Sequence, residues 1–209
     1  MKFLLIGKNG QVGWELNRSL SKLGNVFAVG RNELDLSMPE TLGAIIQDIR
    51  PDIILNAAAY TDVDKAESEP ELAMTVNGIS PGVIAREAKK IGAGMIHYST
   101  DYVFDGKATS PYKEENPIYP LNVYGKSKLV GEQAVIQVGI PHIIIRTSWV
   151  YSLRNSNFLL TIQKLAQTRN QIKVVDDQTG APTWARSIAE GTKKILEQSL
   201  SKSTKTEKL

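Results

Sequence analysis

The first twenty residues constrain the fold more than any other part of the chain. The apolar run Phe3–Ile6 leads into GKNGQVG at positions 7–13, after which Trp14, Leu16 and Leu20 recur at roughly helical spacing. This order predicts a buried strand, a tight turn and a helix. A glycine-rich turn lets the backbone approach a phosphate closely, and the first N–H groups of the helix attract an anion. The stretch therefore predicts the start of a dinucleotide-binding α/β fold.

Three glycines carry this interpretation, each with its own expected role. Gly7 lets the chain turn, Gly10 lets the backbone come close to a pyrophosphate, and Gly13 lets the helix pack closely. Their spacing is G-x-x-G-x-x-G, which differs from the G-x-G-x-x-G of the plain dinucleotide fingerprint. A glycine-rich turn in another kind of α/β protein would give the same pattern, so this alternative stays open at this point.

Composition excludes several classes of protein. The chain has 209 residues, enough for one sizeable core, and it has no cysteine, which excludes disulfides and thiolate chemistry. No apolar run approaches the length of a membrane span, and the N-terminal run is too short for a signal peptide. Most of the net charge of +3 comes from lysines in residues 199–209. We therefore expect a cytoplasmic protein with no membrane and no nucleic-acid partner.

The end of the second predicted strand, Asn25–Val29, indicates the type of dinucleotide. In such folds this strand end meets the adenosine ribose, where an acidic residue holds the 2′-hydroxyl and an arginine suits a 2′-phosphate. Arg31 follows the strand and favours NADP, although a solvent-exposed loop arginine is the alternative. Asp35 and Leu36 follow in a loop that we expect under the adenine.

Two segments in the first half carry helix-start signals. Residues 37–40, Ser-Met-Pro-Glu, form a capping-box pattern with an early proline, which predicts a helix through Ile49. The pattern Ser68-x-x-Glu71 predicts a second capped helix, which runs to Lys90.

Small residues follow the third predicted strand, Ile53–Leu55. Asn56–Ala59 would leave room for a flat ligand at the carboxyl end of that strand, although close helix packing is the alternative. In the helix that comes next, Pro81 has no N–H to donate to the carbonyl of Asn77. That carbonyl is expected to be available for another partner, unless the proline only kinks the helix.

Polar side chains cluster where the fourth predicted strand, Met95–Tyr98, ends. Ser99–Tyr102 supply hydroxyl and carboxyl groups at the sheet edge where catalytic groups of such folds lie. Residues 105–120 are rich in glycine and proline and long enough to form a functional lid. His97 and His142 are expected to be structural.

Tyr124 and Lys128 lie four residues apart on a predicted helix and therefore share one face. A nearby ammonium lowers the pKa of a phenol, so that Tyr124 would exchange a proton near neutral pH. The pattern Y-x-x-x-K occurs by chance on many helices. Here it follows a glycine turn and a Ser-Thr strand end in the expected order, which favours a catalytic pair.

The last third of the chain completes the predicted domain. The β-branched run His142–Ile145 predicts a strand that is buried on both faces. Thr183 is expected to cap the last helix. The domain is expected to span residues 1–198, followed by a polar tail at 199–209. The other expected elements are a helix at Phe158–Thr168, a strand at Ile172–Val175, a loop at Asp176–Trp184 and a helix at Trp184–Gln198.

Longer motifs extend these observations through about Gln198. Together they resemble the extended short-chain dehydrogenases/reductases, and among them most closely the dTDP-4-dehydrorhamnose reductase family. The resemblance implies an α/β fold with a doubly wound parallel sheet of the Rossmann type. The motifs are GKNGQVGWEL (7–16), NAAAYTDVDKAESEP (56–70), HYSTDYVFDG (97–106), PLNVYGKSKLVGE (120–132), RTSWVY (146–151) and DQTGAPTW (177–184).

The resemblance implies a reaction and roles for residues. NADPH, with NADH as an alternative, would pass a hydride to C4 of dTDP-4-dehydro-β-L-rhamnose and give dTDP-L-rhamnose. Tyr124 would be the general acid, Lys128 would hold the nicotinamide ribose, and Thr100, helped by Ser99, would bind the carbonyl oxygen. Asn77 matches the position whose carbonyl holds a proton-relay water in related enzymes.

By the same resemblance, further residues would contact the cofactor and the sugar nucleotide. The expected cofactor contacts are Gly7, Gly10, Gln11, Val12, Arg31, Asp35, Leu36, Ala57, Ala58, Tyr60, Tyr124 and Lys128. The expected substrate contacts are Asp101, Val103, Trp149 and Asn157.

The chain also departs from this family. Members normally continue into a smaller C-terminal region that closes over the sugar nucleotide. We expect most of that region to be missing here, either because the chain is a fragment or because the gene is truncated. Glu15 matches a metal ligand found in parts of the family, but Arg186 stands where an acid is expected. We therefore predict no metal, with a homodimer as a possible assembly.

Two alternatives to this reductase stay open. The first is a truncated, non-catalytic NADP-binding module, similar to the regulatory subunit of methionine adenosyltransferase. The second is a reductase or epimerase that acts on another deoxysugar nucleotide. The motifs STDYVFDG and DQTGAPT weigh against the second alternative.

Overall fold

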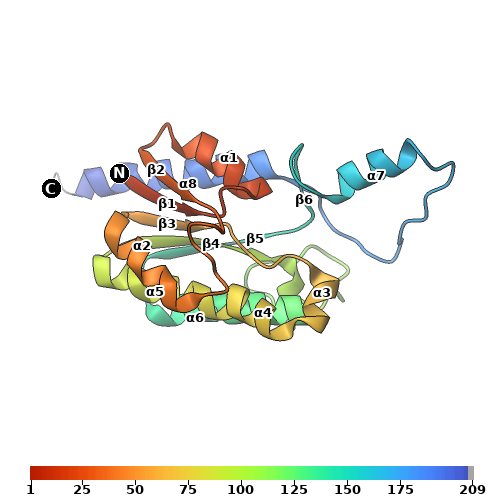
Figure 1. The fold of residues 1–209 in the computed structure, drawn as a ribbon, viewed down its shortest axis with the longest axis horizontal. Coiled ribbons are helices and arrows are strands. Elements are labelled where there is room, and N and C mark those ends of the chain that lie inside the picture. Colours follow the sequence, from red (N-terminus) through yellow and green to blue (C-terminus); the bar gives the residue numbers. More distant parts are fainter. Residues whose placement is uncertain (207–209) are drawn as a thin grey trace.

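Five parallel strands form the central sheet, with helices on both faces (Figure 1). The computed structural model describes the backbone of residues 1–206 and the side chains of residues 1–199. The strands stand in the order β2-β1-β3-β4-β5, so the order reverses beside β1, from which the chain runs first to β2 and then back to β3. This confirms the predicted doubly wound α/β class. The strands are β1 (Lys2–Ile6), β2 (Asn25–Val29), β3 (Ile53–Asn56), β4 (Gly94–Thr100) and β5 (His142–Thr147).

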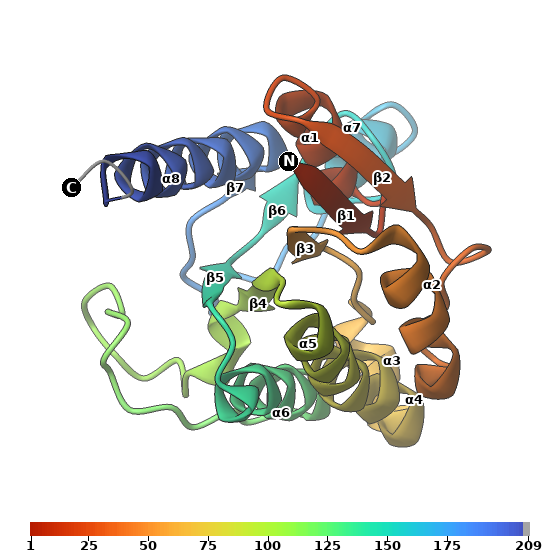
Figure 2. The same cartoon turned by 90° about the vertical axis from the view of Figure 1, so that its left-hand side faces the viewer.

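The helices form two layers, which Figure 2 shows on opposite sides of the sheet. One layer holds α1 (Gln11–Leu20) and α8 (Ala185–Thr206), and the other holds α2 (Leu42–Ile49), α5 (Ser80–Ile91) and α6 (Val123–Val138). Each layer buries its own apolar cluster against the sheet. None of the helices in the described part of the chain is both long and apolar enough to cross a membrane.

Strand β1 is buried on both faces. Phe3 and Leu5 belong to the cluster under α1 and α8, whereas Leu4 and Ile6 belong to the cluster under α2, α5 and α6. All four side chains are at most 1% exposed. Two buried faces require an unbroken apolar run, which is why this strand was readable in the sequence.

Strand β5 differs from the prediction of burial on both faces. It lies at the sheet edge and pairs only with β4 among the described residues. Its residues Ile143–Thr147 are only partly buried. The prediction was wrong because a β-branched run reports strand propensity, while burial depends on what packs against each side.

Both predicted capping boxes were wrong, although the predicted helix ends at Ile49 and near Lys90 agree with the ends of α2 and α5. Residues Pro39–Thr41 form a short 3₁₀ turn before α2, and its N-cap, Met38, provides no side-chain cap. Ser68 ends α3 (Val63–Ser68), and its hydroxyl donates to the carbonyl of Lys65 (2.9 Å). A serine near a helix end can bond the preceding turn as readily as cap the following one, so the pattern alone does not decide.

The expected interruption near Pro81 is present as a π-helical turn, η2 (Thr75–Ile79). This turn joins α4 (Pro70–Met74) to α5. Pro81 stands in the first turn of α5, where its missing N–H removes the least helical bonding.

The C-terminal third departs most from the prediction. Residues 172–175 form no strand, because they have no neighbouring strand to pair with, and Val174 and Val175 are 52% and 69% exposed. Instead, β6 (Val150–Tyr151) pairs with β7 (Thr183–Trp184). Thr183 therefore lies in a strand and does not cap the last helix. Its hydroxyl donates to the carbonyl of Ala181 (3.1 Å).

Two helices of this region differ in their surroundings. Helix α7 (Phe158–Ala166) buries no residue and projects from the body of the molecule, as Figure 1 shows. Helix α8 continues through Thr206, beyond the predicted end at Gln198. The predicted polar tail is therefore helical at least to Thr206, and residues 207–209 lie outside the described residues.

Candidate active site

A cleft of about 420 Å³ opens at the carboxyl ends of the strands, beside the point where the strand order reverses. Open α/β sheets bind their ligands at this place. The cleft runs from the glycine turn and the loop after β2 to the first turns of α6. The predicted residues that line it are Gly7, Gly10, Gln11, Val12, Arg31, Asp35, Leu36, Ala57, Ala58, Tyr124 and Lys128.

The cleft lining and the predictions differ at several positions. Thr61 and Ala59 line the cleft, whereas Tyr60 does not, and its hydroxyl donates to Glu69 (2.8 Å). Predicted residues outside the lining are Thr100, Asp101, Val103, Trp149 and Asn157. Lining residues that the sequence did not indicate include Asn9, Leu34, Thr147, Asn155 and Ser156.

The glycine turn has the geometry that its residues require. Gly7 adopts φ +96°, which glycine reaches without strain, and its amide donates to the carbonyl of Val29 (2.9 Å). A Cβ at Gly13 would lie 2.0 Å from the carbonyl oxygen of Gly7. The first turn of α1 therefore packs directly on the glycine turn, and the N–H groups at its start face the cleft side of the sheet.

The loop after β2 forms one end of the cleft. The amide of Ser37 donates to Asp35 Oδ1 (2.9 Å), and this bond is the main cause that holds the pKa of Asp35 below its usual value. Leu36 is buried, and Ser80 Oγ donates to its carbonyl. Arg31 stays exposed on this loop, available for an anion.

Lys128 is the most deeply buried charged side chain of the cleft, with 1% of its surface exposed. Its Nζ donates to the carbonyl of Tyr98 (2.7 Å). Burial lowers the pKa of Lys128 to about 8, although the carboxylate of Glu132, one helical turn away, opposes this change. A lysine with this pKa holds or releases a proton near neutral pH.

Tyr124 departs from the expectation of an acidified phenol. Burial raises its pKa to about 12, and a hydrogen bond with Thr100 only partly opposes this increase. The prediction failed because desolvation of the phenolate outweighs any nearby positive charge, and the Lys128 ammonium is directed to the Tyr98 carbonyl. In this state Tyr124 keeps its proton. The ring of Tyr102 packs edge-on against it, with the ring centroids 5.6 Å apart.

Asn77 organises a polar network that the sequence did not reveal. Its side chain accepts from the amide of Tyr60 (2.9 Å), donates to the carbonyl of the same residue (2.9 Å) and donates to Ser127 Oγ (3.1 Å). The network ties η2 to α6 next to Lys128. The Asn77 carbonyl faces Gly131, where a Cβ would lie 2.1 Å from the oxygen. The relay-water role of this carbonyl stays a prediction.

A second polar network joins α6 to β5 and to the predicted lid. Arg146 makes two hydrogen bonds to Glu132, at 2.9 and 2.7 Å, and the Glu132 side chain is 2% exposed. The guanidinium also lies over the ring of Phe104, 5.1 Å from its centroid, and that ring stacks on Tyr112. Such a bidentate pair fixes both side chains, so the loop that begins at Phe104 is anchored to α6 and β5.

Gln11 connects the glycine turn to the segment after β6. Its Oε1 accepts from Ser152 Oγ (2.8 Å) and from Asn157 Nδ2 (3.0 Å). Asn157 also caps α7, because its Oδ1 accepts from the amide of Leu160 (3.1 Å). The geometry gives Asn157 a structural position, and its expected contact with the sugar nucleotide stays a prediction.

The other predicted substrate residues have distinct surroundings. Val103 is fully buried, and Trp149, with φ +44°, packs against Gly180 and remains 43% exposed. Burial raises the pKa of Asp101, which accepts from Thr100 Oγ1 (3.1 Å). Their roles toward a substrate stay predictions.

No group of three or more side chains suited to a metal ion occurs among the described residues. Glu15, which the resemblance suggested as a metal ligand, is largely buried and pairs with Arg18 (2.8 Å).

The class of the protein follows from where these groups stand. A glycine turn lies at the switch point of a parallel sheet, and a tyrosine and a buried lysine share one face of α6. This is the arrangement of an NAD(P)-dependent oxidoreductase domain. Within that class, the family described as "RmlD substrate binding domain" matches residues 1–208, and the chain belongs to it.

Relatives in sequence agree with this family. A dTDP-4-dehydrorhamnose reductase of Burkholderia thailandensis is 54% identical over 94% of this chain and 66% of its own length. A protein of the same name from Escherichia coli K12 is 48% identical over 97% of this chain and 69% of its own length. The chain thus spans about two thirds of the length of these relatives.

Solved structures agree as well. A dTDP-4-dehydrorhamnose reductase of Clostridium acetobutylicum superposes with a TM-score of 0.91 at 36% identity, over 95% of this chain and 71% of that one. A Bacillus anthracis reductase of the same name, solved in complex with NADP, gives a TM-score of 0.90 with the same identity and coverage. The resemblance expected from the sequence motifs is confirmed.

Proposed function

We propose that the chain binds NADPH and reduces dTDP-4-dehydro-β-L-rhamnose at C4 to dTDP-L-rhamnose. The observation that carries this proposal is a single cleft lined by the glycine turn, Arg31, Tyr124 and Lys128. The family and the NADP complex of a relative support it. We accordingly expect a cytoplasmic enzyme that acts on a sugar nucleotide and forms a homodimer.

The residues present fit the dinucleotide. The left-handed Gly7 and the close contact at Gly13 leave the glycine turn open to a pyrophosphate, and Arg31 suits a 2′-phosphate at the far end. NADPH supplies the hydride when it is bound. Ala57 and Ala58, at the end of β3, leave the floor of the cleft free of large side chains.

Tyr124 is the proton donor in this proposal. Because burial raises its pKa to about 12, the phenol is protonated at neutral pH, as a general acid must be before the reaction. Thr100 interacts with the Tyr124 phenol, and in this proposal its hydroxyl turns from Asp101 to donate to the carbonyl oxygen of the sugar. Lys128 lines the same cleft, and its positive charge would stabilise negative charge that develops on the reacting oxygen.

The experiment compares turnover with binding. NADPH oxidation by the chain with dTDP-4-dehydro-β-L-rhamnose is measured by absorbance, and NADPH binding is measured separately by fluorescence. Tyr124→Phe should lower turnover by about 10³-fold, the usual contribution of a general acid, and leave NADPH binding nearly unchanged. Tyr119→Phe, on an exposed loop residue, is the matched control.

Each outcome bears on the proposal. Turnover that persists in Tyr124→Phe would remove the proton-donor role. Tight NADPH binding without turnover in the unmodified chain would contradict the reductase proposal and favour a non-catalytic NADP-binding module. Turnover that is greater with another keto-sugar nucleotide would redirect the substrate assignment.

A further inference from the structure

The loop after β2 carries acids as well as a base, which leaves the choice of dinucleotide unexplained by Arg31 alone. Asp35 lines the adenosine end of the cleft together with Arg31, and Glu33 lies between them in the chain, outside the lining. A carboxylate at this strand end favours the ribose 2′-hydroxyl of NAD, whereas a cation favours the 2′-phosphate of NADP. An unpaired Glu33 would therefore oppose Arg31.

Glu33 is held by two donors. Its Oε1 forms an ion pair with Lys8 Nζ, and its Oε2 accepts from the amide of Gly30 (2.9 Å). The bond to Lys8 is the largest cause that lowers the pKa of Glu33. Both oxygens of the carboxylate are thus engaged within the protein, and one of the donors, Gly30, itself lines the cleft.

Lys8 comes from the glycine turn and reaches across the end of β2. Its amide donates to the carbonyl of Val29 (3.1 Å), which fixes the backbone from which the side chain starts. A Cβ at Gly30 would lie 2.8 Å from Asn9 Nδ2 and 3.5 Å from Lys8 Cε. Glycine at position 30 therefore lets the side chains of the turn lie over the strand end.

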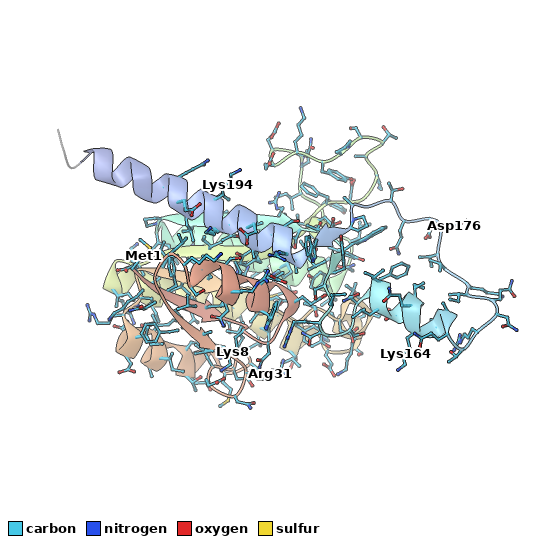
Figure 3. All side chains as sticks on the ribbon, turned by 90° about the horizontal axis from the view of Figure 1, so that it is seen from above. Met1, Lys8, Arg31, Lys164, Asp176 and Lys194 are labelled. Atoms are coloured by element: carbon cyan, nitrogen blue, oxygen red, sulfur yellow. The ribbon has the colours of Figure 1, made fainter. Side chains whose placement is uncertain are left out.

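Arg31 is the cation left for a ligand. It makes no hydrogen bond or ion pair within the part of the chain that the structure describes, although its charge contributes to the lowered pKa of Asp35, whereas Lys8 is paired with Glu33. Figure 3 places Lys8 and Arg31 on the same edge of the molecule. Lys8 is therefore engaged by Glu33, whereas Arg31 is available to an anionic ligand.

We propose that Lys8 determines specificity indirectly: it neutralises Glu33, so that Arg31 can select the phosphorylated dinucleotide. This rests on the proposed NADPH-dependent function and adds to it a residue pair that sets the preference. Lys8 is a positioning and masking residue here, and no contact between Lys8 and the cofactor is needed.

The test uses equilibrium binding of NADPH and NADH, with no turnover. Lys8→Met leaves Glu33 charged and unpaired, so NADPH should bind about five- to tenfold more weakly while NADH binds equally or more tightly. In the double variant K8M/E33Q the repulsive charge is removed, and NADPH affinity should return to within about twofold of the unmodified chain. Lys90→Met, which breaks an exposed ion pair with Glu87 on α5, is the matched control and should change neither affinity.

Three outcomes would overturn the proposal. If the double variant fails to recover NADPH affinity, Lys8 acts as a direct phosphate ligand. If NADPH and NADH weaken together in Lys8→Met, the residue maintains only the shape of the turn. If neither affinity changes, the pair has no part in selection. Failure of the unmodified chain to bind NADPH would instead refute the proposed function itself, so the two failures are distinguishable.

Discussion

The two ends of the cleft use charge in opposite ways. At the α6 end, Lys128 and Glu132 are at most 2% exposed, and burial dominates the pKa of both Lys128 and Tyr124. At the β2 end, the side chains of Lys8 and Glu33 are 32% and 45% exposed, and hydrogen-bonded partners dominate the pKa of Glu33. Water screens the second pair and not the first. The buried end can therefore set protonation states for chemistry, whereas the exposed end can only bias which ligand binds.

The comparison predicts the largest effect at Lys128. Lys128→Met keeps most of the side-chain volume and removes the charge, so turnover of dTDP-4-dehydro-β-L-rhamnose should fall by about 10³-fold. Steady-state NADPH oxidation measures this change, and Lys126→Met, an exposed neighbour on α6, is the control. A loss smaller than about tenfold would mean that the buried charge has no catalytic part.

The next effect is on stability, at Glu132. Glu132→Ala leaves the guanidinium of Arg146 without its bidentate partner and removes a buried carboxylate, which should cost about 3 kcal/mol of the free energy of unfolding. Urea denaturation measures it. Glu197→Ala, at an exposed ion pair with Lys193 on α8, should change stability by less than about 1 kcal/mol. Equal losses of stability in the two variants would show that the buried ion pair contributes no more to the free energy of unfolding than the exposed one.

A pH dependence of similar size is expected from Lys128. Its pKa is about 8 in the folded chain, against 10.5 ordinarily, so the unfolded chain binds more protons between these two values. The free energy of unfolding should therefore rise with pH from about 8 to 10, by up to about 3 kcal/mol. Above pH 10 the raised pKa of Tyr124 acts in the opposite sense, because the folded chain then holds the extra proton.

The rise is isolated by subtraction. Urea denaturation of the unmodified chain and of Lys128→Met at pH 7.5, 8.5 and 9.5 gives a difference in which the other lysines and tyrosines cancel. The free energy of unfolding of the unmodified chain minus that of Lys128→Met should become more positive as pH increases. Parallel pH profiles would show that Lys128 is better solvated than its burial implies.

The sequence predicted the parts of this molecule that local pattern determines. Strand β1 and its glycine turn were readable because an apolar run buried on both faces meets residues that only a tight turn requires. The Tyr124 and Lys128 pair was readable because helical spacing puts them on one face. The strand predicted at residues 172–175 failed because a strand needs a partner, which no local pattern supplies.

The features that the sequence missed depend on tertiary contacts. The bonds of Asn77 to Ser127 and of Gln11 to Asn157 join residues far apart in the chain, and neither partner is unusual in its own surroundings. The direction of the Tyr124 pKa was missed for the same reason. Spacing identifies a neighbouring ammonium, but only the packed structure shows how much water has been excluded.

The smallest effect is expected at Arg31, and it sharpens the comparison at the exposed end. Arg31→Ala should weaken NADPH binding by about tenfold, since one solvent-exposed cation facing a phosphate contributes roughly 1.4 kcal/mol. NADH, which lacks the 2′-phosphate, should lose less than about twofold. Both affinities are measured by fluorescence at low and high salt. High salt should reduce the NADPH effect, because an exposed charge is screened. Equal losses of affinity for both dinucleotides would show that Arg31 does not recognise the 2′-phosphate. A loss of NADPH affinity that salt does not change would show that Arg31 is shielded from solvent in the complex, as the buried charges are.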